Sequence, residues 1–225
     1  MSSLYLIVNI ASLSVPLIYS FEKRMHFIQW WKEVFLSILI VGTFFILWDV
    51  IFTDLGVWGF NRKYLVGITA INLPIEEWLF FICIPYASIF THYAVIYFYP
   101  QFKLETTAIK IISGVLITFL LMVVIFNVDK KYTFYNFTLL IVLLLYGFFK
   151  NDKSIKIFYL TFCIILIPFF LVNGILTGSF IDEQIVWYND AENLGIRLFT
   201  IPIEDVGYAF NLLYMNILLI EKLKK

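Results

Sequence analysis

The sequence is poor in charged residues. Only 14% of its 225 residues are Asp, Glu, Lys or Arg, whereas 62% are hydrophobic. A soluble globular domain carries about 25% charged residues, so one soluble core explains this composition poorly. The formal net charge is zero, and this balance points to neither nucleic acid nor an acidic partner.

The sequence also has few residues of the kinds that bind metals and cofactors. Its two cysteines, Cys83 and Cys163, lie in apolar runs with neither metal-ligand spacing nor a disulfide framework, and we interpret them as packing residues. Two histidines are too few for a usual zinc or haem site. Neither a glycine-rich dinucleotide fingerprint nor a phosphate-binding loop occurs, so we expect no metal and no cofactor.

Long apolar runs fill most of the chain instead. They predict an all-α polytopic membrane protein, a single membrane domain over 1–225, because each run is about long enough to cross a hydrocarbon core of roughly 30 Å as a helix. The first run is not a convincing signal peptide, since no basic residue precedes it and it lacks a clear cleavage site. The predicted transmembrane helices are seven, at 4–21, 34–51, 74–98, 111–128, 132–149, 157–176 and 202–220.

The basic residues of the loops predict an orientation in the membrane. The loops after the first, third and fifth spans, together with the C-terminus, hold 11 Lys and Arg residues, whereas the opposite side holds 5. Cytoplasmic loops carry the excess of positive charge, so we expect the N-terminus outside and the C-terminus in the cytoplasm of a bacterial or archaeal cell.

The chain matches itself at an offset of 128 residues. The alignment pairs Leu73-Pro74-Ile75-Glu76-Glu77 with Ile201-Pro202-Ile203-Glu204-Asp205, and it also pairs Phe60-Asn61 with Tyr188-Asn189, Gly67 with Gly195 and Phe80 with Tyr208. We therefore expect a first repeat over 1–100, a connector span over 101–130 and a second repeat over 131–225. Because the connector restores the direction of the chain, the two three-helix repeats are predicted to be parallel and to share one site.

The two acidic motifs have a structural and a functional interpretation. Proline and acidic residues are favoured in the first turn of any helix, so the four acids could be simple N-terminal charges. However, only 15 residues, 206–220, separate the second motif from Glu221, so a spanning helix must draw that motif into the membrane or to its edge. A carboxylate deep in hydrocarbon costs about 2.5–3.5 kcal/mol, which favours a functional site.

A buried pair of acids has the parts of an acid–base catalyst. Burial and a neighbouring carboxylate favour a neutral acid, while helix N–H groups support an ionised one, so one acid can donate a proton and another can accept it. Aromatic side chains next to the motifs could face a cation. Asp49, near the end of the second predicted span, is a candidate third polar wall of the same site.

The duplicated Pro-x-Glu-Glu/Asp motif, with Phe or Tyr three or four residues later, resembles the membrane-type lycopene β-cyclases. This family occurs as two small three-span subunits, as a fused chain, and as a domain of fungal bifunctional proteins. The resemblance covers nearly the whole chain. Asp205 in place of a second Glu is one departure, so the two halves need not be equivalent in catalysis.

The resemblance implies a non-redox isomerase of carotenoid biosynthesis that cyclises the ends of lycopene, or a similar acyclic carotenoid, to β-ionone rings. We expect the catalytic residues to be Glu76, Glu77, Glu204 and Asp205, with Glu76 and Glu204 as donor and base in an unassigned order. We expect the substrate to contact Trp78, Phe80, Phe81, Tyr208, Asn61, Asn189 and Asp49. The expected partners are the carotenoid, the lipid bilayer and other enzymes of the carotenoid pathway, and no nucleic acid.

Two other functions stay open at this point. A carotenoid hydratase, or another end-group enzyme, would use the same protonation and let water capture the cation. A protein that binds carotenoid without catalysis, or that conducts protons, would also need apolar spans with buried acids.

Overall fold

A computed structural model describes residues 3–150 and 153–224 of the chain. Seven α-helices make up most of this part, with short strands and 3-10 helices between them. The helices are α1 (Leu4–Tyr19), α2 (Trp31–Asp54), α3 (Ile75–Phe98), α4 (Thr106–Phe126), α5 (Lys131–Lys150), α6 (Lys153–Thr177) and α7 (Ile203–Leu223). The 3-10 helices are η1 (Phe27–Trp30), η2 (Arg62–Tyr64) and η3 (Asp190–Glu192). The strands are β1 (Trp58–Phe60), β2 (Thr69–Ala70), β3 (Leu73–Pro74), β4 (Val186–Tyr188), β5 (Arg197–Leu198) and β6 (Ile201–Pro202).

The predicted all-α class is confirmed, and six of the helices in the described residues are long and apolar enough to cross a membrane. The exception is α1, whose 16 residues cover about 24 Å at 1.5 Å per residue. α1 is apolar but shorter than the six candidate spans, so its crossing of the bilayer as a seventh span stays a prediction. The fourth predicted helix begins earlier than expected, at Thr106, and the last two begin and end within a few residues of their predicted bounds.

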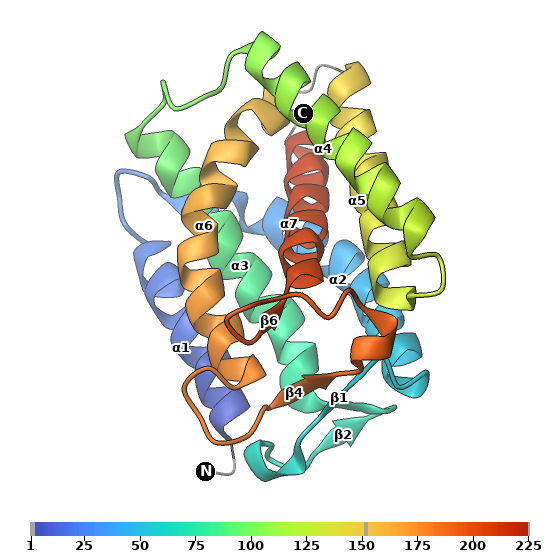
Figure 1. Cartoon of the computed structure of the whole chain (residues 1–225). Coiled ribbons are helices and arrows are strands. Elements are labelled where there is room, and N and C mark those ends of the chain that lie inside the picture. The colour runs from blue at the N-terminus through green and yellow to red at the C-terminus, as the bar shows by residue number, and fades with distance from the viewer. Residues whose placement is uncertain (1–2, 151–152, 225) are drawn as a thin grey trace.

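The helices form a bundle around α7, and the two chain ends lie at opposite ends of it (Figure 1). α1 lies along α3, and α2 packs against both α3 and α7. α5 packs against α7 on its other side and is covered by α4. α6 packs against α3 and α7 and makes only a small contact with α1.

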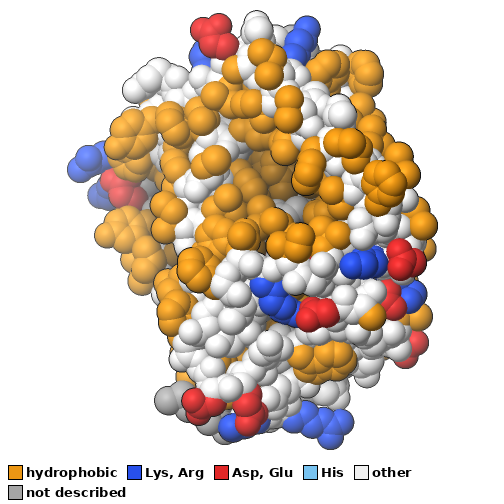
Figure 2. All heavy atoms as spheres, viewed as in Figure 1, with side chains coloured by type: hydrophobic (Ala, Val, Ile, Leu, Met, Phe, Trp, Pro, Cys, Tyr) orange, Lys and Arg blue, Asp and Glu red, His pale blue; other side chains and the backbone are white. Residues whose placement is uncertain are grey.

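Apolar side chains cover much of the outer surface of this bundle. α4 has the smallest buried share of the six spans, and its outward side chains include the exposed Val115, Phe119 and Ile125. Figure 2 shows an apolar band on one face, with charged side chains gathered mostly toward its edges. An apolar exterior of this kind is the surface expected of an integral membrane protein.

The loops at the N-terminal end of the bundle contain paired strands that the sequence did not predict. β1 and β4 pair antiparallel, with Gly59 opposite Trp187, and so join the loop before α3 to the loop before α7. β2–β3 and β5–β6 are two small hairpins that lead directly into α3 and α7. Their turns contain Ile71 and Phe199, exposed residues with positive φ angles of 62° and 59° that stand 128 positions apart.

The contact between α5 and α7 gives a test of the packing. A Cβ at Gly207 would lie 3.1 Å from the Phe137 ring and 3.3 Å from the Asn136 amide. Gly207→Leu should therefore lower the stability by about 1–3 kcal/mol through overpacking. Gly114→Leu on α4 is the control, because nothing lies within 4 Å of its Cβ. Thermal unfolding in detergent measures both, and equal melting temperatures would contradict the packing described here.

Candidate functional site

The two acidic motifs open α3 and α7 after the two hairpins. Pro74 and Pro202 end the strands β3 and β6 with extended backbone angles, and the helix begins at the next residue. The first helical N–H groups are held by the hairpins, because Ile75 N donates to Ile68 O at 2.9 Å and Ile203 N to Ile196 O at 3.0 Å. Each hairpin thus sets the angle at which its helix enters the bundle.

The first acid of each motif is turned toward the preceding loop. Glu76 and Glu204 are both 0% exposed. Glu76 Oε1 accepts a 2.6 Å hydrogen bond from the backbone N–H of Val66, and Glu204 Oε1 accepts one of 2.8 Å from that of Leu194. The Thr133 hydroxyl also donates to Glu204 at 2.6 Å. These carboxyl groups fasten the loop to the helix N-terminus, where the helix dipole favours negative charge.

Two asparagines hold the same turns from the neighbouring helices. Asn9 Nδ2 on α1 donates to the backbone oxygen of Glu76 at 2.7 Å, and Asn136 Nδ2 on α5 donates to that of Glu204 at 2.7 Å. Both asparagines are fully buried. A buried amide that meets a backbone carbonyl fixes the rotation of one helix against the next, because an unpaired partner would cost about 1–3 kcal/mol.

The second acid of each motif faces a cavity instead. The cavity has a volume of about 600 Å³ and lies between α1, α3 and α6, with α7 as its inner wall. Glu77 and Asp205 both line it, and so does Asp49 from α2. Its other walls are mainly apolar and include Ile7, Val8, Ala11, Ile84, Ala87, Ile165, Phe169, Val172, Leu212 and Leu213.

Tyrosine hydroxyls donate hydrogen bonds to Glu77 and to Asp205, the second acids of the two motifs. Tyr5 donates to Glu77 Oε2 at 2.6 Å, and Tyr132 donates to Asp205 Oδ1 at 2.6 Å. Asp205 Oδ2 receives two more bonds, from the Tyr188 hydroxyl at 3.0 Å and from Asn173 Nδ2 at 3.4 Å. Burial, and then the Asp205 carboxyl, hold the pKa of Tyr188 well above its ordinary value, so its hydroxyl remains a donor.

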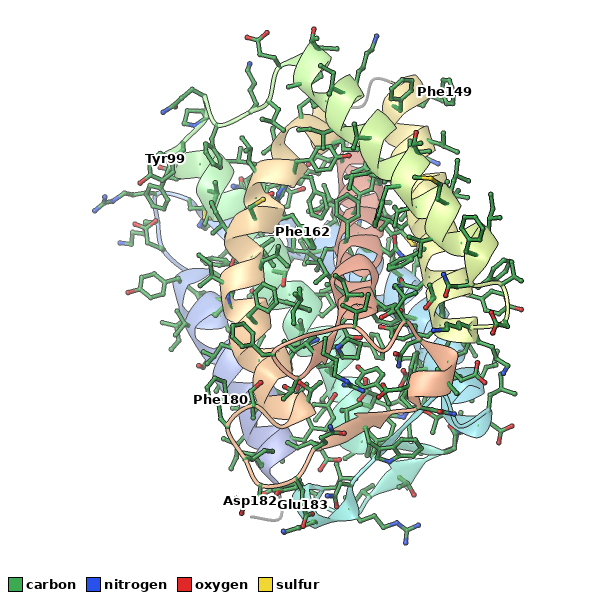
Figure 3. All side chains as sticks on the ribbon, viewed as in Figure 1. Tyr99, Phe149, Phe162, Phe180, Asp182 and Glu183 are labelled. Atoms are coloured by element: carbon green, nitrogen blue, oxygen red, sulfur yellow. The ribbon has the colours of Figure 1, made fainter. Side chains whose placement is uncertain are left out.

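Aromatic rings surround the acids on the α7 side. The Tyr208 ring lies 5.0 Å from that of Phe45 and 6.0 Å from that of Trp48, both edge to face. Trp58 contacts the rings of Tyr132 and Tyr188 at 5.0 and 6.1 Å. Farther along the cavity, Phe162 points from α6 toward α7, and its ring centroid lies 5.1 Å from that of Phe210 (Figure 3). Such π faces attract positive charge.

The structure brings together only part of the predicted site. Glu77, Asp205, Asp49, Phe80 and Tyr208 line the cavity, whereas its lining does not include Glu76, Glu204, Trp78, Phe81, Asn61 or Asn189. Phe81 packs against Phe45. The side chains of Asn61 and Asn189 accept hydrogen bonds from the backbone of Lys63 and Ala191 and cap η2 and η3. Since neither asparagine lines the cavity, the substrate contacts expected of them stay a prediction.

Sequence reasoning predicted Tyr208 but missed the three tyrosines that donate hydrogen bonds to the cavity acids. Tyr5, Tyr132 and Tyr188 all line the cavity and bond its acids. A signal for two of them was present, because Tyr5 and Tyr132 stand 127 positions apart, almost the offset of the acidic motifs. Tyr188 lies in a loop with no such partner, since the aligned residue is Phe60.

These features define a class of protein, an integral membrane protein with carboxyl groups in an apolar cavity. The sequence model of the lycopene cyclase family matches residues 2–95 and 129–223, which is most of the chain. The chain therefore belongs to the lycopene cyclase family and is an enzyme of that kind. Searches of curated proteins and of solved structures give no match.

The loop-fastening acids can be tested by two kinds of substitution. In Glu76→Gln and Glu204→Gln the amide oxygen can still accept the loop N–H, so the stability should change little. In Glu76→Leu and Glu204→Leu the loop N–H loses its acceptor and the part-buried hydrogen bond is lost, so the cost should be about 1–3 kcal/mol. Melting temperatures in detergent give the comparison, with exposed Glu183→Gln as control. Equal effects of Leu and Gln would show that the hydrogen bonds do not hold the loops.

Proposed function

We propose that this protein is a lycopene β-cyclase, which converts the acyclic ends of lycopene to β-ionone rings without net oxidation or reduction. The observation that carries the proposal is the placement of Glu77 and Asp205 in one apolar cavity among aromatic rings. Membership of the lycopene cyclase family supports the substrate class. The two acids supply what a proton-initiated cyclisation needs, a donor and an acceptor in a mainly apolar cavity.

The reaction balances with one proton in and one proton out. The π electrons of the terminal double bond take a proton from a carboxylic acid and leave a tertiary cation. The next suitably placed double bond attacks this cation, which forms the ring bond and moves the positive charge into the ring. A carboxylate then removes a ring proton, and the electrons of that C–H bond form the ring double bond.

We infer that the acids of the cavity handle these protons and that Glu76 and Glu204 hold the scaffold. Glu77 and Asp205 line the cavity, whereas Glu76 and Glu204 each accept a hydrogen bond from the backbone of the preceding loop. This order reverses the emphasis expected from the sequence, which ranked Glu76 and Glu204 first. All four acids remain part of the catalytic apparatus, two by contact with substrate and two by positioning.

We also infer that the chain consists of two parallel repeats, 1–100 and 131–225, joined by a connector at 101–130. Equivalent hydrogen bonds support this. The backbone N–H groups of Val66 and Leu194 donate to the carboxyl groups of Glu76 and Glu204. The side chains of Asn9 and Asn136 donate to the backbone oxygens of the same two acids. The excess of basic residues supports an N-terminus outside and a cytoplasmic C-terminus, with α1 as a seventh span.

The proton-transfer roles predict an order of effects in cells that accumulate lycopene. Glu77→Gln and Asp205→Asn should each lower β-ring formation by about 100- to 10,000-fold, the usual share of general acid–base catalysis. Glu76→Gln and Glu204→Gln should retain much more activity. Pigment chromatography measures the products. Full activity of Glu77→Gln would remove the assignment, and a tertiary alcohol of higher mass from the wild type would instead indicate a hydratase.

The position of the substrate can be tested by filling the cavity. Ala87 on α3 lines it, so Ala87→Phe should obstruct the hydrocarbon chain and raise the KM for lycopene by about tenfold, equivalent to 1.4 kcal/mol of lost binding. Ala108→Phe on α4, outside the cavity lining, is the matched control. Initial rates in lipid vesicles loaded with lycopene provide the measurement. An unchanged KM for Ala87→Phe would place the substrate elsewhere.

A further inference from the structure

Asp49 is a buried carboxyl that the proposed roles above leave unused. It lies on α2, is 4% exposed, and lines the same cavity as Glu77 and Asp205. Its Oδ2 atom is buried without a hydrogen-bond partner among the described residues. The carboxyl interacts electrostatically with Glu77, and the Trp58 side chain lines the same cavity.

An unpartnered buried oxygen is much less costly on a neutral acid than on a carboxylate. Two carboxyl groups that interact in one apolar cavity also resist losing both protons, because little solvent screens the repulsion between the two negative charges. The side of the cavity formed by Asp49 and Glu77 is therefore suited to keep a proton at neutral pH.

The other side of the cavity differs at the corresponding place. Asn173 on α6 donates an amide hydrogen to Asp205, whereas Asp49 on α2 brings a second carboxyl group into electrostatic interaction with Glu77. Asp205 thus accepts from three donors, Tyr132, Tyr188 and Asn173. Among the described residues Glu77 accepts from one donor, Tyr5, so the larger number of donors favours the ionised form of Asp205.

We propose, resting on the proposed cyclase function, that Asp49 is a third catalytic carboxyl which with Glu77 holds the proton delivered to the substrate, and that Asp205 is the carboxylate that removes the ring proton. The proton leaves the Asp49–Glu77 pair for the terminal double bond, and the negative charge that remains faces the new cation. The ring proton passes to Asp205, so the net charge of the cavity is restored once that proton returns to the pair.

The central experiment compares Asp49→Asn with wild type in vesicles that contain lycopene, with rates expressed per amount of folded protein. We expect ring formation to fall about 100-fold or more, the scale of a lost general acid, while lycopene still binds. Asp49→Glu keeps a carboxyl and should recover part of the rate. Asp54→Asn, at the exposed end of α2, is the matched control and should equal wild type.

Two further measurements distinguish a chemical role of Asp49 from a structural one. Residual turnover of Asp49→Asn should show a larger solvent isotope effect in heavy water than wild type, because proton delivery becomes slower than the later steps. Asn173→Asp should also lower the rate about tenfold or more, since it gives Asp205 a carboxyl neighbour that competes for the proton.

The possible outcomes are distinct. No ring product from wild-type protein would end the proposed function itself. With wild type active, a normal rate of Asp49→Asn would overturn the role of Asp49. A loss of folded protein shared by Asp49→Asn and Asp49→Glu, with an unchanged isotope effect, would make Asp49 a structural residue and overturn it as well.

Discussion

The structure depends on how acidic side chains are held inside an apolar bundle. A carboxylate that leaves water must find hydrogen-bond donors or keep a proton, since an uncompensated charge is too costly to bury. Glu76 and Glu204 each have one oxygen, Oε1, that accepts from the backbone of the loop that precedes it. The loops in turn pair as strands, and their hairpins hold the first N–H groups of α3 and α7.

This arrangement gives consecutive acids different tasks. Neighbouring residues on a helix point about 100° apart, so one acid of each motif turns to its loop while the next turns to the cavity. The residue that fastens the loop thereby fixes the direction of the residue that faces the cavity. Asn9 and Asn136 add a second constraint, because each holds the same turn against a neighbouring helix.

The two sides of the cavity share a scaffold but not a chemistry. Tyr5 and Tyr132 occupy corresponding places and each donates to the acid of its side. Asp49 and Asn173 then differ in the property that matters for proton transfer, since one is a carboxyl and the other an amide donor. Asp and Asn have nearly the same shape, so in the proposed mechanism this difference sets which side holds the proton without a change in packing.

The amino-acid sequence by itself determined the helices, the six long apolar spans and the position of both acidic motifs, because hydropathy and helix-start signals belong to contiguous residues. It did not show the β1–β4 pairing, whose partners are far apart in the chain, or the tyrosines that bond the acids. Tertiary structure alone decided that Glu77, Asp205 and Asp49, rather than Glu76 and Glu204, line the cavity. The rotation of a helix about its axis is set by packing and hydrogen bonds to its neighbours, and no local pattern encodes it.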